Sequence, residues 1–175
     1  MTTTKEIEFQ PLSIAVMTVS DSRTEENDTS GNILVERLIT AGHHLYEKKI
    51  VADDIYQMRA IVSAWIANPE VQVVISTGGT GLTGRDVTPE AMKPLYDKEI
   101  DGFGELFRKI SYDFIKTSTI QSRAVAGLAN GTVIFSLPGS PGACKDGWDH
   151  IIQHQLDIRH RPCNLVEIMP RFLEK

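Results

Sequence analysis

Residues 71–90 read VQVVISTGGTGLTGRDVTPE, and this stretch decides the fold. Its first part, residues 71–77, is β-branched, of strand length and apolar on both faces, as in a parallel strand covered by helices on both sides. Glycines follow at positions 78, 79, 81 and 84. Thr88-Pro89-Glu90 then has the form of a helix start, with a capping hydroxyl, proline in the first turn and an acid behind it. The stretch predicts a strand, a glycine-rich turn and a helix.

The same alternation recurs along the chain. Residues 12–19 and 132–137 are apolar runs of strand length, whereas residues 44–51 are more polar and are expected nearer the sheet edge. Helical patterns lie between them at residues 30–41 (capped by Ser30 and stopped by Gly42), 55–66, 103–114 and 148–156. Strand and helix in alternation predict an α/β fold, a three-layer Rossmann-like arrangement with a mostly parallel sheet flanked by helices.

Length and composition limit the class of protein. The chain of 175 residues fits a single domain spanning residues 1–175, and its net charge of −5, without a basic stripe, argues against a nucleic-acid partner. No apolar run approaches the roughly 20 residues that span a bilayer, so no membrane partner is expected. Two cysteines and a polar start favour a cytoplasmic location. Residues 1–10 are expected to be flexible, and the tail, residues 161–175, to pack along the surface or against another subunit.

Ligands of open parallel sheets bind beyond the carboxyl ends of the strands. The loop over residues 77–84 is one such end, and its glycines allow positive φ angles and close approach of a ligand. Successive N–H groups in such a turn form an anion-binding concavity, to which Thr77 and Thr80 add hydroxyls. The alternative is a tight turn that only needs glycine. We favour a phosphate site built from Thr77, Gly78, Gly79, Thr80 and Gly81, although the loop matches neither the P-loop nor the dinucleotide pattern.

Carboxylates accompany this loop. Asp86 beside a phosphate cradle would be repulsive unless a cation such as Mg²⁺ offsets its charge, and Mg²⁺ is commonly held by one or two carboxylates plus substrate phosphates. The alternative is that Asp86 caps the next helix or pairs with Arg85. Asp53 and Asp54 follow the strand of residues 44–51. One of them is expected to cap the following helix, which leaves the other free for a metal.

Two further strand ends carry polar loops. Ser20 and Asp21 follow the first strand, and Pro138-Gly139-Ser140-Pro141-Gly142 follows the strand of residues 132–137. Ser140 offers a hydroxyl to a ligand, and the alternative is a rigid turn into the last helix.

Residues 76–91, STGGTGLTGRDVTPEA, resemble the signature of the molybdenum cofactor biosynthesis proteins of the molybdopterin-binding superfamily. The resemblance extends in the same order over almost the whole chain, through these motifs: Val19-Ser20-Asp21, Asp28-Thr29-Ser30-Gly31, Gly102-Phe103-Gly104-Glu105, Ser122-Arg123-Ala124 and Leu137-Pro138-Gly139-Ser140-Pro141. It implies a homotrimer or homohexamer that binds molybdopterin, a pterin with a dithiolene and a terminal phosphate.

In the adenylyltransferases of this superfamily, ATP and Mg²⁺ serve to transfer AMP to the pterin phosphate. The resemblance implies that Asp53 and Asp86 are the catalytic, Mg²⁺-holding carboxylates, and that Ser20, Asp21 and Ser140 contact the pterin or its phosphate. The expected function is therefore adenylylation of molybdopterin in molybdenum cofactor biosynthesis. The alternatives are a non-catalytic molybdopterin carrier in the same pathway and a nucleotide-binding protein without a pterin.

Overall fold

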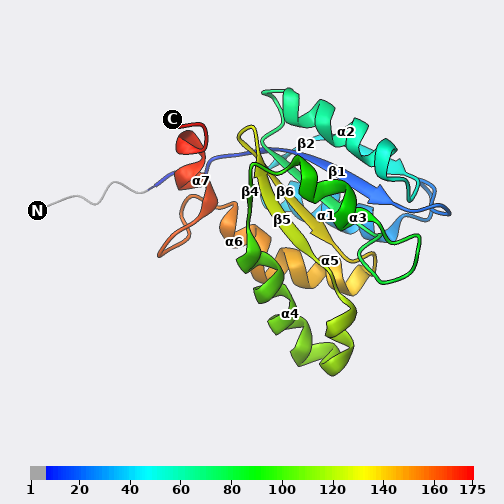
Figure 1. The fold of residues 1–175 in the computed structure, drawn as a ribbon. Helices are drawn as coiled ribbons and strands as arrows, with labels where there is room; N and C mark the ends of the chain where they lie inside the picture. The colour runs from blue at the N-terminus through cyan, green and yellow to red at the C-terminus, as the bar shows by residue number, and fades with distance from the viewer. Residues whose placement is uncertain (1–6) are drawn as a thin grey trace, which may run out of the picture.

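The computed structural model describes residues 7–175, which form three layers with a six-stranded sheet in the middle (Figure 1). The strand order is β2-β1-β3-β6-β5-β4. Four strands are mutually parallel, namely β1 (Ser13–Val19), β2 (His44–Val51), β3 (Val73–Thr77) and β6 (Thr132–Leu137). The polar strand β2 lies at the sheet edge, as its sequence predicts. The α/β fold with a mostly parallel sheet is confirmed.

Two strands were not predicted, and each forms an antiparallel pair, so that β5 runs opposite to the other strands of the sheet. They are β5 (Val125–Ala129) and β4 (Lys98–Glu99), with β5 paired to β6 and β4 to β5. β5 and β6 form a hairpin whose turn residues, Asn130 and Gly131, have φ angles of +48° and +83°. Asn-Gly is the preferred pair for such a two-residue turn, because both positions need positive φ. This dipeptide was the signal that could have found the hairpin.

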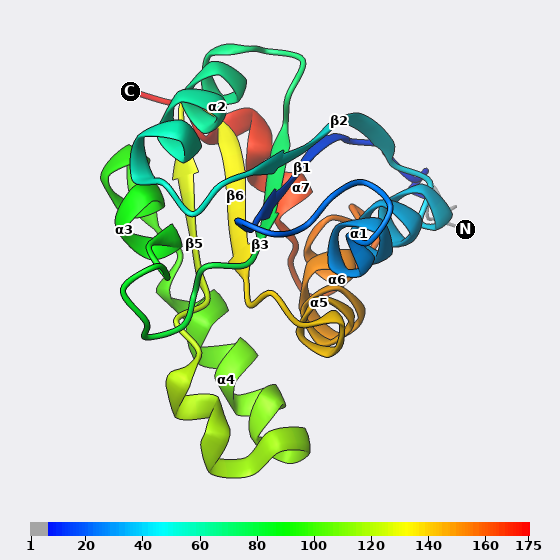
Figure 2. The same cartoon turned by 90° about the vertical axis from the view of Figure 1, so that its right-hand side faces the viewer.

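Helices cover both faces of the sheet (Figure 2). On one face, α1 (Thr29–Thr40), α4 (Asp101–Ile115) and α5 (Pro141–Gly147) enclose a core that includes Leu34, Phe107 and Trp148. The helix of α5 continues through a π-helical turn, Trp148–Ile152, into α6 (Gln153–Gln155). On the other face, α2 (Ile55–Ala67) and α3 (Thr88–Met92), followed by the 3₁₀ turn Lys93–Leu95, enclose a second core with Met58, Val62 and Met92.

Two of the predicted helix caps are wrong. Asp28, not Ser30, caps α1 by accepting the Gly31 N–H, and the Ser30 hydroxyl instead donates to the Gly139 carbonyl at 2.8 Å. Thr88 begins α3 as predicted, but its hydroxyl donates to the Gly78 carbonyl at 2.8 Å and does not cap the helix. In both cases the hydroxyl ties a helix to a neighbouring loop of the sheet edge.

The expected stripe over residues 103–114 is core only in part. Phe103 and Phe107 are buried in α4, but Leu106 is 43% and Phe114 is 60% exposed. The reason is that the outer turns of α4 and the 3₁₀ segment Lys116–Gln121 project beyond the sheet (Figure 2).

The C-terminal tail is packed on the rest of the chain, and the N-terminal segment is described only from residue 7. In the tail, α7 (Leu165–Ile168) and the 3₁₀ turn Met169–Arg171 pack on the chain itself, with Val166 buried in the first core. Of the expected flexible start, residues 1–6 lie outside the described residues, and Phe9 packs on His43 with ring centroids 5.1 Å apart. Among residues 7–175, every helix is too short or too polar to cross a membrane.

Candidate functional site

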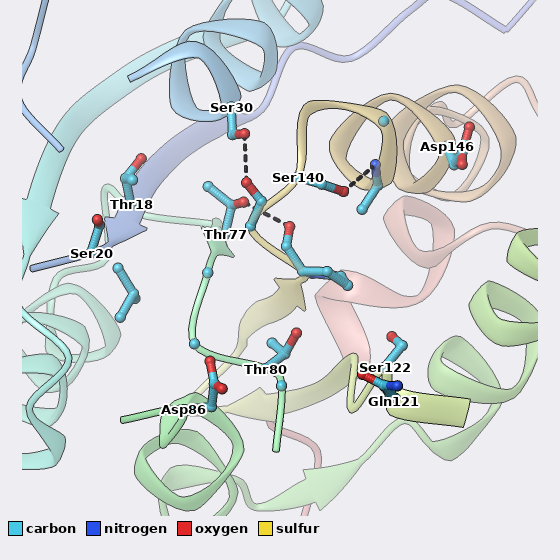
Figure 3. A pocket seen from close by; sticks show the side chains of 18 of the residues that line it. Thr18, Ser20, Ser30, Thr77, Thr80, Asp86, Gln121, Ser122, Ser140 and Asp146 are labelled. Atoms are coloured by element: carbon cyan, nitrogen blue, oxygen red, sulfur yellow. Dashed lines mark hydrogen bonds between the residues drawn. The ribbon is translucent and has the colours of Figure 1, made fainter. Parts of the chain in front are cut away.

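A cavity of about 750 Å³ opens at the carboxyl ends of β1, β3 and β6, the edge where open parallel sheets bind ligands (Figure 3). The loops after β1, β2, β3 and β6 form one part of its wall, and α4 with the segment Lys116–Gln121 forms another. Most of the predicted site residues line it: Ser20, Asp53, Thr77, Gly78, Gly79, Thr80, Gly81, Asp86 and Ser140. The structure therefore brings together groups that are up to 120 residues apart in the chain.

The glycine-rich loop has the backbone form that its sequence predicts. Gly78 and Gly79 have φ angles of +104° and +67°, a region that side chains disfavour. A Cβ at Gly78 would also overlap the Val19 carbonyl oxygen. Among the described residues, the N–H groups of Gly79 and Thr80 donate to no protein acceptor. Two adjacent free amides beside a cavity are what an anion-binding turn requires.

The two loop threonines differ. Thr77 is 1% exposed, and its hydroxyl donates to the Pro138 carbonyl at 2.9 Å and lies 3.1 Å from the Cys144 thiol. The prediction that Thr77 offers its hydroxyl to a ligand is therefore wrong, because that group already joins the second and third loops. Thr80 lies across the cavity from Ser140 in Figure 3. The loops after β3 and β6 also approach closely at Gly139, because a Cβ at that position would lie only 3.2 Å from the Gly78 Cα.

The adjacent acids after β2 have separate roles. The Asp54 side chain caps α2 by accepting the N–H groups of Tyr56 and Gln57 at 2.9 and 2.8 Å. Asp53 lines the cavity, and none of the described side chains donates a hydrogen bond to its carboxylate. Burial first, and then the nearby charge of Asp21, raise the pKa of Asp53 above its ordinary value. The expectation that one acid caps the helix and leaves the other free is confirmed.

Asp86 is held by its own loop. Its Oδ2 accepts the Thr83 N–H at 2.9 Å and the Thr83 hydroxyl at 2.7 Å. These hydrogen bonds from Thr83 lower the pKa of Asp86 below its ordinary value, so the group stays ionised. Neither alternative considered for Asp86 holds. The N-cap of α3 is Val87, without a side-chain bond, and Arg85 pairs with another acid.

Asp21 is the acid that pairs with Arg85, and it does not line the cavity. Its carboxylate accepts two-pronged hydrogen bonds from Arg85 and also the Asp53 N–H at 3.1 Å. The Arg85 side chain lowers the pKa of Asp21. The predicted direct contact of Asp21 with a ligand is therefore not supported by its position. Asp21 instead connects the loops after β1, β2 and β3 at the cavity rim.

The serines of the first and third loops both line the cavity and both have structural partners. Ser20 Oγ accepts the N–H groups of Ser22 and Arg23 at 3.2 Å. Ser140 caps α5 by accepting the Ala143 N–H at 3.2 Å. Each hydroxyl keeps a proton that can be donated to a ligand. Ser140 thus both starts the turn into α5 and lines the cavity.

Sequence reasoning missed the wall built by α4 and the segment after it. Phe114 and the nearly buried Phe107 line this part of the cavity. Gln121 and Ser122 add polar groups to it (Figure 3). The Ser122 hydroxyl is buried and has no hydrogen-bond partner among the described residues. Such a group gains a partner when a ligand with a polar edge binds. A flat heterocycle has both the faces and the edges that suit this wall.

Four carboxylates line the cavity, namely Asp28, Asp53, Asp86 and Asp146, and the pair beside the glycine loop, Asp53 and Asp86, suits a magnesium ion better than a transition metal. Among residues 7–175, no three His, Cys, Asp or Glu side chains gather closely enough to hold a metal by themselves. Mg²⁺ does not need such a cage, because it is bound by one or two carboxylates plus waters and substrate phosphates. Asp53 and Asp86 flank the glycine loop: a Cβ at Gly79 would lie 3.2 Å from Asp53 Oδ1, and a Cβ at Gly81 would lie 2.8 Å from Asp86 Oδ2.

Comparisons with known proteins find a matching family model and close relatives over most of the chain. Residues 15–158 match the family described as "Probable molybdopterin binding domain". The chain is 57% identical over 157 residues to "Molybdenum cofactor biosynthesis protein B" of Escherichia coli K12, covering 90% of this chain and 92% of that protein.

Solved structures show the same relationship. A crystal structure of a molybdenum cofactor biosynthesis protein B superposes with a TM-score of 0.84 at 42% identity, covering 93% of this chain and 96% of that one. The "tungsten cofactor synthesizing protein MoaB" of Pyrococcus furiosus superposes with a TM-score of 0.72 at 41% identity, covering 81% and 91% of the two chains.

Proposed function

Because this chain belongs to the molybdopterin-binding family of molybdenum cofactor biosynthesis proteins, we propose that it transfers AMP from ATP to the terminal phosphate of molybdopterin. Molybdopterin binding and a place in molybdenum cofactor biosynthesis follow from the family. The adenylyl transfer rests on one observation of the site. Two carboxylates, Asp53 and Asp86, flank a glycine loop with free amides in the same cavity.

The binding mode follows from the chemistry of the cavity wall. The N–H groups of Gly79 and Thr80, with the hydroxyl of Ser140, are placed to receive phosphate oxygens. The aromatic wall of α4 would pack on a ring system, and Gln121 and Ser122 would meet its polar edge. The ligand would therefore lie with its phosphate at the strand ends and a ring toward α4.

The reaction needs little covalent help from the protein. An oxygen of the pterin phosphate attacks the α-phosphorus of ATP, a new P–O bond forms, and the bond to pyrophosphate breaks. The protein contributes by positioning both phosphates and stabilising their charge. Mg²⁺ held by Asp53 and Asp86 would neutralise charge on the triphosphate. Asp86, with its lowered pKa, is ionised and ready to bind a cation at neutral pH.

The test is direct. Pure protein incubated with molybdopterin, ATP and Mg²⁺ should release pyrophosphate and form adenylylated pterin, detected by chromatography and mass. Asp86→Asn should abolish this product while leaving the circular dichroism spectrum unchanged. Absence of product above a protein-free blank would refute the adenylyl transfer.

A second candidate is a molybdopterin carrier without turnover. The observation in its favour is that the free amides of Gly79 and Thr80, which would hold the phosphate, do not depend on either carboxylate. A carrier should bind molybdopterin equally well after Asp86→Asn, whereas a nucleotide-binding protein without a pterin partner should bind ATP alone. Equilibrium binding of both ligands to both variants separates these functions.

We further propose that the chain forms a homotrimer or homohexamer through the projecting part of α4. Large apolar side chains are exposed there and on the segment after it: Leu106, Tyr112, Phe114, Ile115 and Ile120. An exposed apolar group of this size on a projecting helix is typical of an interaction surface. Light scattering coupled to size exclusion would give the number of subunits.

A further inference from the structure

Arg123 lies between the segment Lys116–Gln121 and β5, and it reaches back to the loop that carries Asp86. Its Nε donates to the Gly81 carbonyl at 2.8 Å, and one of its terminal nitrogens donates to the Asp86 carbonyl at 2.7 Å. Its own backbone N–H donates to the Thr80 carbonyl at 3.2 Å. One residue thus binds three carbonyls of the loop over residues 80–86.

The two terminal nitrogens of the guanidinium also donate to the carboxylate of Glu90, in the first turn of α3. This ion pair orients the planar group, so that its other donors point at the loop. The hydrogen bond from Arg123 lowers the pKa of Glu90, and the Arg123 side chain is only 29% exposed. The loop is therefore held between β5 and α3 by one partly buried group.

We propose that Arg123 is the positioning residue that fixes the Asp86 carboxylate and the amides of Gly79–Gly81 toward the ligand. Within the loop, Asp86 is bound to Thr83, and the backbone of Gly81 lies against the Asp86 carboxylate. These short-range contacts set the shape of the loop, but they do not attach it to the rest of the molecule. Arg123 attaches it at Gly81 and at Asp86, on both sides of Thr83.

The geometry requires arginine. A guanidinium offers five donors in a planar fork, whereas a lysine ammonium is a single point charge on a flexible stem. Lysine at position 123 would keep the charge but could not bind both carbonyls and Glu90 at once. Arg123→Lys therefore changes the attachment of the loop with little change in charge. The effects on catalysis and on cation binding rest on the proposed function, whereas the effect on the loop does not.

The experiment compares wild type, Arg123→Lys and a matched control, Arg171→Lys. Arg171 also pairs with a glutamate, Glu174, but it is exposed and lies outside the cavity. Three measurements are made on each protein: Mn²⁺ affinity by electron paramagnetic resonance, hydrogen exchange at the Thr83 and Asp86 amides, and adenylylation kinetics. Circular dichroism and thermal unfolding report whether each variant is folded.

Loss of groups that orient metal ligands typically costs 10–100-fold in affinity or activity. We expect Arg123→Lys to weaken Mn²⁺ binding about 10-fold and to speed exchange at both loop amides by at least 10-fold, with β3 amides unchanged. Adenylylation should fall 10–100-fold, mainly in kcat. Arg171→Lys should match wild type in every measurement.

If Arg123→Lys binds Mn²⁺ within twofold of wild type and exchanges its loop amides at the wild-type rate, the assignment is wrong. If the wild type itself shows no turnover, the proposed reaction fails, and the hydrogen-exchange data still decide whether Arg123 holds the loop. If Arg123→Lys does not fold, Glu90→Gln replaces it, because it removes only the partner that orients the guanidinium. A smaller but measurable loss of Mn²⁺ affinity in Glu90→Gln supports the role, and wild-type affinity overturns it.

Discussion

Asp28 and Lys48 form an ion pair of 2.9 Å beside the cavity, and the Asp28 side chain is only 1% exposed. The same carboxylate accepts the Thr18 hydroxyl at 2.7 Å and caps α1 through the Gly31 N–H. A buried charge with this many partners is costly to disturb, because removal of one member leaves the others unpaired.

Asp28→Asn should therefore lower the free energy of unfolding by up to about 3 kcal/mol, as the Lys48 ammonium loses its buried charged partner and keeps the exposed Glu25 and the Asn32 side-chain oxygen. Urea denaturation measures this. Glu25→Gln is the control, since it removes the exposed partner of the same lysine. Equal losses from both substitutions would contradict the importance of the buried pair.

Gly79→Ala should prevent ligand binding and destabilise the fold. A Cβ at this position would overlap the Thr88 hydroxyl and lie 3.2 Å from Asp53, and the residue has a φ of +67°. We expect a loss of about 1–3 kcal/mol in stability and no detectable molybdopterin binding. Gly84→Ala, in the same loop, is the matched control because a Cβ there has no neighbour within 4 Å. Binding by calorimetry should be normal for Gly84→Ala, and a similar loss in both variants would contradict this account.

Asp53→Asn should stabilise the metal-free protein while it abolishes activity. The raised pKa of Asp53 means that the folded state disfavours its charge, so ionised Asp53 lowers stability at neutral pH. We expect Tm to rise by on the order of 2 °C in the presence of a chelator. Asp54→Asn keeps a capping oxygen and serves as the control. If Asp53→Asn had a lower Tm than the wild type in the presence of chelator, the charge of Asp53 would be stabilised by neighbouring groups, and this prediction would be wrong.

Stability should decrease below neutral pH because of His43. This side chain is 4% exposed, accepts the Leu12 N–H through Nδ1 at 3.1 Å, and has its pKa lowered by burial to about 4. The unfolded chain binds a proton near pH 6.5, whereas the folded chain does so only near pH 4, so stability is lost as pH falls between these values. The loss from this group approaches about 3 kcal/mol. Denaturant titrations from pH 7 to pH 4 should show this slope, and His43→Gln should reduce it.

The apolar runs of the sequence were sufficient to predict β1, β3 and β6, because buried strands are β-branched and apolar on both faces, and the more polar β2 was predicted as a strand nearer the sheet edge. β5 escaped this pattern, since VAGLA is small and contains Gly127, where a Cβ would overlap the ring of Tyr96. The small residues of β5 leave space for this ring, and they therefore do not form the run of large apolar residues by which the other buried strands were recognised. Its only clear mark in the sequence was the Asn-Gly turn that follows it.

For the site, backbone requirements were predictable and side-chain partners were not. Glycines at 78 and 79 indicate positive φ from the sequence alone, and the structure confirms both. The partner of Arg85 could not be predicted, because Asp21 is 64 residues away and meets it only at the sheet edge. The same holds for Arg123, whose importance depends on the loop that the fold places beside it.

The split between Asp53 and Asp54 constrains how the chain can change over evolution. Asp54 can cap α2 only because it stands at the residue before the helix, and Asp53 faces the cavity only because it stands one residue earlier. Removal of Asp54 would move Asp53 into the capping position and take its charge out of the cavity. We therefore expect related chains to differ in this connection by substitution and not by length.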